Sequence, residues 1–243
     1  MPQPLPAEPW DYEAPPEGRP EPPPTQDELP CDDGEPIQTQ RHKWQMDLLI
    51  CPLDRWLEVR GEGYVNGNMF VYFSLEQTRG AYFRGPDVFV VLGVPRGERK
   101  AWVVWEQGKA PDLVIELLSD TTRAHDKGEK MRVYQDQMRV PEYCWYDPFN
   151  PSDLAAFRLM DGRYQPLGPG ADGRLTSSIL GLCLVHWEGV FNGLPGSWLR
   201  WATPDGVPLP TEGEAERERA ERAEAELAAL RAALDGGAGT SGR

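Results

Sequence analysis

Apolar residues recur at two spacings along the middle of the chain, and each spacing predicts one kind of element. The stretch "TQRHKWQMDLLI" repeats them at helical spacing behind Thr39, a good helix cap, and predicts the first helix. The aromatic and β-branched stretch "GYVNGNMFVYFS" predicts a strand that follows a Gly-Asn turn. "GPDVFVVLGV" and "PDLVIELLS" are apolar nearly throughout, which is typical of interior strands covered on both faces.

Further elements follow the same logic. "WVVWEQG" predicts a short strand at a sheet edge, and a helix is expected from about Ala124 to Met138. "PEYCWYDP" predicts another strand, and "LAAFRLMDGRYQPL" predicts a hairpin that turns at Asp161-Gly162. Strands with one strand-helix-strand crossing predict an α/β fold in which a mixed central sheet is flanked by helices.

The two ends of the chain differ from this patterned domain, which we assign to residues 31–210. Residues 1–30 hold eleven of the 25 prolines among acidic residues, a composition that predicts a disordered arm. Residues 211–243 predict a charged helix and a flexible tail. The helix carries a heptad seam of about two repeats, which is short for a coiled coil and equally consistent with a solvated helix. The seam residues are Ala220, Ala223, Leu227, Leu230 and Leu234.

The net charge of −14 argues at first against a nucleic-acid partner. The first 36 residues, however, contain ten acidic residues and one basic residue, whereas residues 79–139 contain eleven basic and nine acidic ones. The four cysteines lack the spacing of a zinc site or a disulfide scaffold, which fits a reducing cytoplasm. The chain has neither a signal-peptide pattern at its start nor an apolar run long enough to span a bilayer, so we expect no membrane partner.

Glu116 is the residue that the pattern of a buried strand does not explain. If the strands that carry Asp87 and Glu116 are neighbours, the two carboxylates reach one pocket, where they repel each other unless one is protonated or a divalent cation binds. Magnesium binds through one or two carboxylates plus water molecules. A salt bridge from Glu116 to Arg123 or Lys130 is the alternative explanation, because it satisfies a buried acid without any chemistry.

A cation beside the attacking water would complete such a site. Lys130 is the preferred candidate, because it lies four residues before Tyr134 and flanks the apolar stripe of the predicted helix. Lys127 lies three residues earlier and is the alternative. Asp112 is on the same strand face as Glu116, but it follows Pro111 at the strand entry and is expected to be a secondary ligand only.

The order of "GPDVFVVLGV", "APDLVIELLSDTT", "DKGEKMRVYQ", "VPEYCWYDP" and "FRLMDGRYQPL" closely resembles the Uma-type family of restriction endonucleases, a branch of the PD-(D/E)xK nuclease superfamily. The resemblance runs from about Leu29 to the C-terminus. It implies a restriction-endonuclease-like sheet and Mg²⁺-dependent hydrolysis of phosphodiester bonds in DNA, with Mn²⁺ as a substitute metal. Asp87 and Glu116 match the metal-binding acids, and the backbone carbonyl of Leu117 is a further metal ligand by the same analogy.

The sequence departs from the superfamily motif at Leu118, which stands where a lysine is expected. In the Uma-type family the lysine looks relocated to the next helix, which implies Lys130 in this chain. A different class of function is a nuclease-like module without activity, which recruits partners through the acidic arm and the C-terminal helix. Cleavage of both DNA strands by a one-site nuclease suggests a homodimer, to which the seam of the C-terminal helix would contribute.

Overall fold

A six-stranded mixed sheet forms the centre of the molecule, in the order β1-β3-β5-β6-β7-β8. The structure is a computed structural model that describes residues 22–31, 39–75 and 85–238, apart from the side chains of residues 233–238. β5 and β6 run parallel, and the other neighbours in this sheet run antiparallel. The strands are β1 (Tyr64–Asn66), β3 (Val88–Val91), β5 (Leu113–Leu117), β6 (Glu142–Tyr146), β7 (Leu154–Met160) and β8 (Arg163–Leu167). The predicted mixed α/β fold is confirmed.

The two predicted interior strands, β3 and β5, are buried along their whole length. One face of the sheet packs against α1 (Gln40–Arg60), which contributes Leu49 and Leu53 to a shared core. The predicted cap is correct, because the Thr39 side chain accepts a hydrogen bond from the backbone N–H of His42. The opposite face carries a second apolar cluster, which includes Phe89, Val114 and Tyr134. Helices therefore cover both faces of these strands, which explains their continuous apolar sequence.

The helix predicted after β5 is present, but most of it has the wider π-helical hydrogen bonding. It begins with α4 (Arg123–His125) and continues through η1 (Asp126–Lys130) and η2 (Val133–Met138). Arg139 ends it in the left-handed conformation, at φ 56°. Single π turns inside helices occur frequently at functional sites. This segment supplies side chains to the candidate site described below.

The stretch "GYVNGNMFVYFS" contains a strand on each side of the Gly-Asn turn. The predicted strand after the turn is β2 (Val71–Tyr72), whereas β1, before the turn, was not predicted and belongs to a different sheet. Gly67 explains the division between the two strands. A Cβ atom there would lie 1.8 Å from the carbonyl oxygen of Asp87, so only glycine permits this close approach of the two backbones. The backbone N–H of Asn68 then donates to the carbonyl of Pro86 at 2.9 Å.

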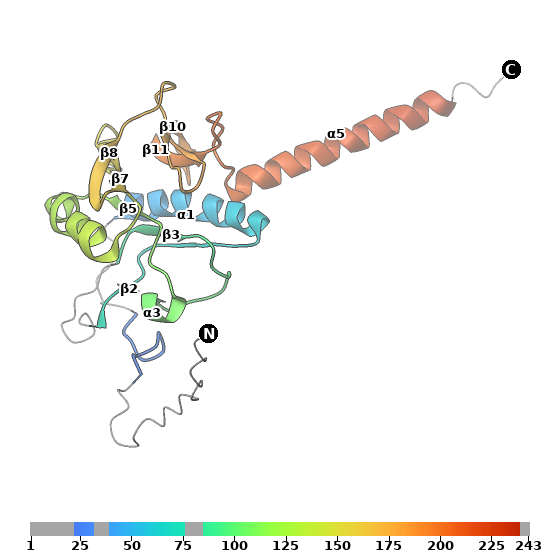
Figure 1. Cartoon of the computed structure of the whole chain (residues 1–243). Helices are drawn as coiled ribbons and strands as arrows, with labels where there is room; N and C mark the ends of the chain where they lie inside the picture. The colour runs from blue at the N-terminus through green and yellow to red at the C-terminus, as the bar shows by residue number, and fades with distance from the viewer. Residues whose placement is uncertain (1–21, 32–38, 76–84, 239–243) are drawn as a thin grey trace, which may run out of the picture.

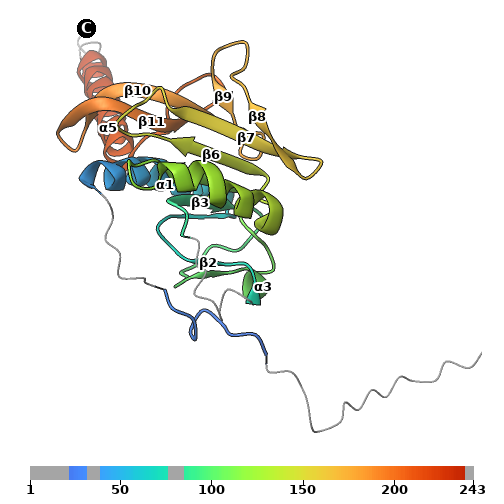
Figure 2. The ribbon, with the colours of Figure 1, turned by 90° about the vertical axis from the view of Figure 1, so that its left-hand side faces the viewer.

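The predicted edge strand "WVVWEQG" is correct only for its first residues. β4 (Trp102–Val103) pairs in parallel with β2 in a separate two-stranded sheet, and α3 (Val104–Gln107) follows it directly. The β2–β4–α3 unit lies at the opposite end of the molecule from the strands of a third sheet, described next (Figure 2).

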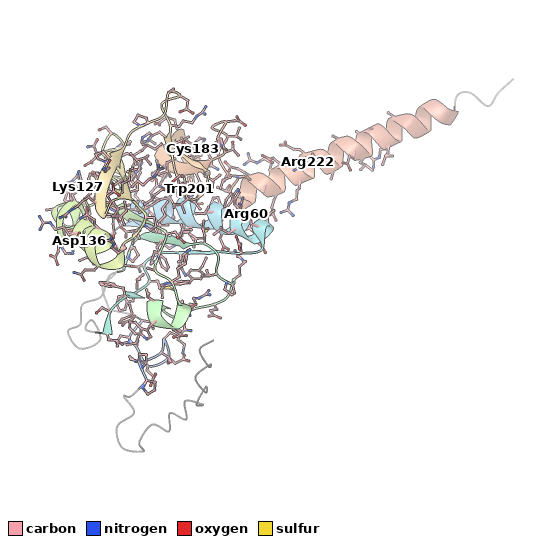
Figure 3. All side chains as sticks on the ribbon, viewed as in Figure 1. Arg60, Lys127, Asp136, Cys183, Trp201 and Arg222 are labelled. Atoms are coloured by element: carbon pink, nitrogen blue, oxygen red, sulfur yellow. The ribbon has the colours of Figure 1, made fainter. Side chains whose placement is uncertain are left out.

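A three-stranded sheet that the sequence reading did not anticipate packs beside α1. Its strands are β9 (Leu175–Thr176), β10 (Cys183–Phe191) and β11 (Leu194–Ala202). Figure 3 labels Cys183 and Trp201 in this sheet, and Trp201 belongs to the core that α1 shares. The Gln45 side chain of α1 donates to the carbonyl of Leu199 at 2.8 Å and accepts from its N–H at 3.0 Å. These bonds attach the third sheet to the central domain.

Both hairpins turn at residue pairs with positive φ angles. The β7–β8 hairpin turns at Asp161 and Gly162, with φ of 49° and 80°, as predicted. The β10–β11 hairpin turns in the same way at Asn192 and Gly193.

The predicted C-terminal helix is α5 (Glu212–Ala238), which extends away from the rest of the molecule (Figure 1). At the other end, residues 1–21 of the predicted arm lie outside the described residues, and residues 22–30 contact the β2–β4–α3 unit. The Trp105 indole donates to the carbonyl of Pro24 at 2.8 Å, and the Tyr72 hydroxyl donates to that of Pro30 at 2.7 Å. None of the helices in the described ranges has the length and apolar character needed to cross a membrane.

Candidate active site

Asp87 and Glu116 come together because β3 and β5 are antiparallel neighbours, as the sequence reading assumed. Val88 pairs with Ile115, so one step further along the register Asp87 stands opposite Glu116. Val88 and Ile115 face the core beside α1, and successive side chains of a strand alternate between faces. The two acids therefore project from the other face, toward the helical segment after β5.

Glu116 is fully buried, and both of its carboxylate oxygens are engaged. The Lys130 ammonium lies 3.0 Å from Oε2, and the Tyr134 hydroxyl donates to Oε1 at 2.6 Å. Asp87 is only partly buried, and its Oδ2 accepts a hydrogen bond from the backbone N–H of Leu117 at 2.6 Å. The site thus joins a fully buried acid to an acid that is partly exposed as a whole residue.

A third carboxylate completes this cluster. Asp126 is 1% exposed, and its Oδ1 lies 3.0 Å from the Lys130 nitrogen. This contact is an ion pair, and Oδ1 makes no hydrogen bond within the described part of the chain. Three acids, namely Asp87, Glu116 and Asp126, therefore surround a single ammonium group. When all are ionised, the cluster carries an excess of negative charge.

The pKa values reflect this crowding. Burial raises the pKa of Glu116 to about 8, the Lys130 ammonium opposes the rise, and the carboxylates of Asp87 and Asp126 add to it. Burial also raises the pKa of Asp87. For Lys130, burial alone would lower the pKa, but the surrounding carboxylates raise it above its ordinary value. Burial followed by the neighbouring Glu116 raises the pKa of Tyr134, so the phenol remains a neutral donor.

The donor set fits a magnesium ion. Among the described residues, no three His, Cys, Asp or Glu side chains are grouped to hold a metal, so an ion here would use two carboxylates with backbone and water oxygens. The Leu117 N–H points to Asp87, and the N–H and carbonyl of one strand residue leave on the same side. The Leu117 carbonyl thus faces Asp87 as well. A divalent cation would offset the excess negative charge that raises the pKa of Glu116.

The structure separates the two lysine candidates. Lys130 contacts Glu116, whereas Lys127 pairs with Asp153 at 2.7 Å and lies over the ring of Trp145 at 5.0 Å. Lys127, labelled on the helical segment in Figure 3, is therefore engaged elsewhere. The salt bridge considered as an alternative explanation of Glu116 is present for Lys130. It is not formed by Arg123, which pairs with Asp147 and Asp153.

Two other positions singled out in the sequence do not join the cluster. Asp112 accepts from the N–H of Leu92 at 2.7 Å and pairs with Lys109 at 2.8 Å. Leu118 is fully buried, its N–H donates to the carbonyl of Tyr146, and its own carbonyl lies 3.0 Å from His42 Nε2. A lysine at position 118 would have to bury its charge, and the cation comes from the helix instead.

The sequence reading missed Asp126 and treated Tyr134 as an apolar core residue. The signal for both was their spacing. Asp126, Lys130 and Tyr134 follow at intervals of four residues, which places side chains on one side of a helix. A polar stripe that runs directly beneath a buried strand acid would have identified them.

Comparisons with known proteins identify the family of the chain. The model of a family named Uma2 and described as "Putative restriction endonuclease" matches residues 12–184. A solved structure, described as a putative nuclease belonging to DUF820 from Anabaena variabilis ATCC 29413, matches at 16% identity with a TM-score of 0.42. That match covers 60% of this chain and 84% of the other. A search of curated proteins found no match.

Proposed function

Because the chain belongs to the Uma2 family of restriction-endonuclease-like proteins, we propose that it is a Mg²⁺-dependent endonuclease that hydrolyses phosphodiester bonds in DNA. One observation carries the proposal: the buried Glu116 lies beside Asp87 in a cluster whose carboxylates outnumber its single ammonium group. Such an arrangement is unfavourable in a metal-free core and is relieved by a divalent cation.

The roles of the residues follow from their contacts. Asp87, Glu116 and the Leu117 carbonyl are the proposed metal ligands, and Mn²⁺ is a suitable substitute for Mg²⁺ because it also accepts oxygen ligands. A bound Mg²⁺ would polarise the phosphate and lower the pKa of a water molecule. Lys130 keeps its proton, so its ammonium can orient the attacking water or stabilise the charge that develops on the phosphate.

Two further side chains hold the proposed catalytic groups in place. The Tyr134 hydroxyl fixes one oxygen of Glu116, and the Asp126 carboxylate forms a second ion pair with the Lys130 ammonium. Fixed side chains of this kind reduce the reorganisation that is needed when the substrate binds. We assign Tyr134 and Asp126 as positioning residues.

DNA is the proposed substrate despite the overall negative charge. The excess of acids lies mainly in the first 36 residues, whereas residues 79–139, which carry the cluster, have a small basic excess. A basic surface favours contact with phosphates. We also propose that the protein acts in the cytoplasm, where it would encounter DNA.

A cleavage assay on the full chain tests the proposal. Supercoiled plasmid, linear DNA and RNA are incubated with Mg²⁺, with Mn²⁺ or with EDTA, and nicked and linear products are measured. We expect DNA cleavage that EDTA abolishes and that Asp87→Asn removes. If no nucleic acid is cut with either metal, the enzyme proposal is wrong and the inactive recruitment module becomes the better explanation.

A matched pair of lysine variants sharpens this assay. Lys130→Met should abolish cleavage, because it removes the ammonium that contacts Glu116. Lys127→Met lies three residues away on the same helical segment, and its charge is used by Asp153. It should retain cleavage, so equal losses in both variants would contradict the assignment of Lys130.

A further inference from the structure

The first turn of α5 is fixed to the body of the protein. Arg200 is 2% exposed, and its guanidinium donates to both carboxylate oxygens of Glu214, at 3.0 and 2.6 Å. The same guanidinium donates to the carbonyl of Leu209 at 2.8 Å. Thr211 and Glu214 also form reciprocal backbone contacts, as in a capping box. The direction in which the helix leaves the body is therefore defined.

Beyond this first turn, α5 has no cover from the described residues. Every residue from Glu216 to Ala232 is exposed, including the seam residues Leu227 at 47% and Leu230 at 62%. Arg222, labelled in Figure 3, stands on this uncovered part of the helix. A helix of this length gains its stability mostly from packing an apolar face, and the seam from Ala220 to Leu230 is not covered by any residue that the structure describes.

The charges beside the seam identify the partner that fits it. Ala220 and Leu227 occupy the first core position of each heptad, and Ala223 and Leu230 occupy the second. The residues directly before the first core positions are Arg219 and Glu226, and those directly after the second core positions are Glu224 and Arg231. In a parallel pair with a second copy in the same register, Arg219 faces Glu224 of the other copy, and Glu226 faces Arg231. All four contacts between the two helices join opposite charges.

The opposite orientation does not share this complementarity. An antiparallel pair overlapping over residues 216–234 would bring Glu224 against Glu224 and Glu226 against Glu226. Like charges in contact disfavour a pairing and thereby select between orientations. The charge pattern therefore favours the parallel arrangement.

We infer that the uncovered face of α5 binds α5 of a second copy of this chain as a parallel, in-register coiled coil. Because the ion pair between Arg200 and Glu214 fixes the start of α5 to the body of each copy, both bodies then lie at the same end of the coil and are related by a two-fold axis. The inference stands on the helix alone. The role of the dimer, which would be to present two active sites to the two strands of DNA, rests on the proposed function.

The mass of the full chain in solution tests the pairing. Light scattering and sedimentation equilibrium should give twice the 27.3 kDa of one chain. The double variant Glu224→Arg/Arg231→Glu and the double variant Arg219→Glu/Glu226→Arg should each weaken self-association by about tenfold or more, because four attractive contacts become repulsive. Mixing the two variants should restore the dimer, since opposite charges then face each other again. A monomeric wild type, or variants that dimerise as well as the wild type, would overturn the inference.

Cross-linking tests the orientation. In a background of Cys31→Ser and Cys51→Ser, which removes the two exposed cysteines, Ala223→Cys faces its own copy only in the parallel, in-register pair. Rapid disulfide formation upon mild oxidation is expected, and its absence in a dimeric protein would contradict the parallel coil. These readouts do not depend on cleavage. A dimer without nuclease activity would therefore refute the proposed function and leave this inference intact.

Discussion

Two buried glutamates on neighbouring parallel strands show how differently one fold treats the same side chain. Glu142, on β6, accepts from the Ser177 hydroxyl at 2.5 Å and from the backbone and hydroxyl of Ser178 at 3.0 and 2.8 Å. Arg158 supplies a positive charge at 3.3 Å. Glu116, on β5, instead has one cation among the described residues, Lys130, and shares it with two other carboxylates, one of which has an oxygen without a hydrogen bond there.

The two acids differ in whether the surrounding residues supply enough hydrogen-bond donors and positive charge to explain their burial. Glu142 accepts three hydrogen bonds from Ser177 and Ser178 and pairs with Arg158, so its burial is explained by its contacts. Burial raises the pKa of Glu116, the carboxylates of Asp87 and Asp126 add to the rise, and the contacts that Glu116 makes with the described residues do not offset this cost. A buried ionisable group that lowers the stability of the fold, and whose burial is not explained by its contacts, is a candidate functional group.

The largest expected effect is on catalysis by Glu116. Glu116→Gln should lower the rate of metal-dependent DNA cleavage by about 10³-fold, because it removes a proposed metal ligand and disturbs the charge around the reacting phosphate. Its free energy of unfolding without metal should stay equal or rise, because a glutamine at position 116 does not have to hold the proton that the buried carboxyl keeps in the folded state and releases on unfolding. Cleavage rates and urea denaturation in EDTA measure the two quantities. A clear loss of stability in this variant would mean that Glu116 serves the fold.

The opposite pattern is expected for Glu142. Glu142→Ala should lower the free energy of unfolding by about 3 kcal/mol, since Ser177 and Ser178 lose their acceptor. At a temperature where the variant is still folded, the cleavage rate per folded molecule should match that of the wild type. Denaturation curves with activity measured on the same samples test this, and a catalytic defect as large as that of Glu116→Gln would remove the distinction between the two acids.

A smaller effect concerns pH. In EDTA, the stability of the wild type should fall as pH rises from about 4.5 to about 8, because the folded state keeps a proton on Glu116 that the unfolded chain releases. Glu116→Gln should flatten this dependence, while Glu142→Gln should keep it. Urea denaturation at several pH values provides the slopes. Identical slopes in the wild type and Glu116→Gln would show that Glu116 does not hold the proton.

The sequence placed the two acids on one face of neighbouring strands because the structures around them are local and regular. Continuous apolar runs identified β3 and β5, and alternation along adjacent strands placed Asp87 and Glu116 on one face. Lys130 followed from helical spacing. The four-residue spacing of Asp126 from Lys130 indicates a shared side of the helix, but the burial of Asp126 depends on how the helix docks against the sheet, which the sequence does not show.

The missing parts of the fold have different causes. The division between β1 and β2 depends on the contact of Gly67 with the backbone of Asp87, which is distant in the sequence. The β10–β11 hairpin, in contrast, had a local signal in Asn192-Gly193 between two strand-forming runs, and it could have been predicted. The ion pair between Arg200 and Glu214, which are fourteen residues apart, joins β11 to α5, and only the structure reveals this contact.

The most direct test of the metal site is an anomalous difference map from crystals of the full chain soaked in Mn²⁺. We expect one strong peak between the carboxylates of Asp87 and Glu116, within coordination distance of the Leu117 carbonyl. Crystals of Glu116→Gln treated in the same way should lack this peak. If the wild-type map shows no ion at this position while Mn²⁺ binds elsewhere on the protein, the cluster is not a metal site and the central claim fails.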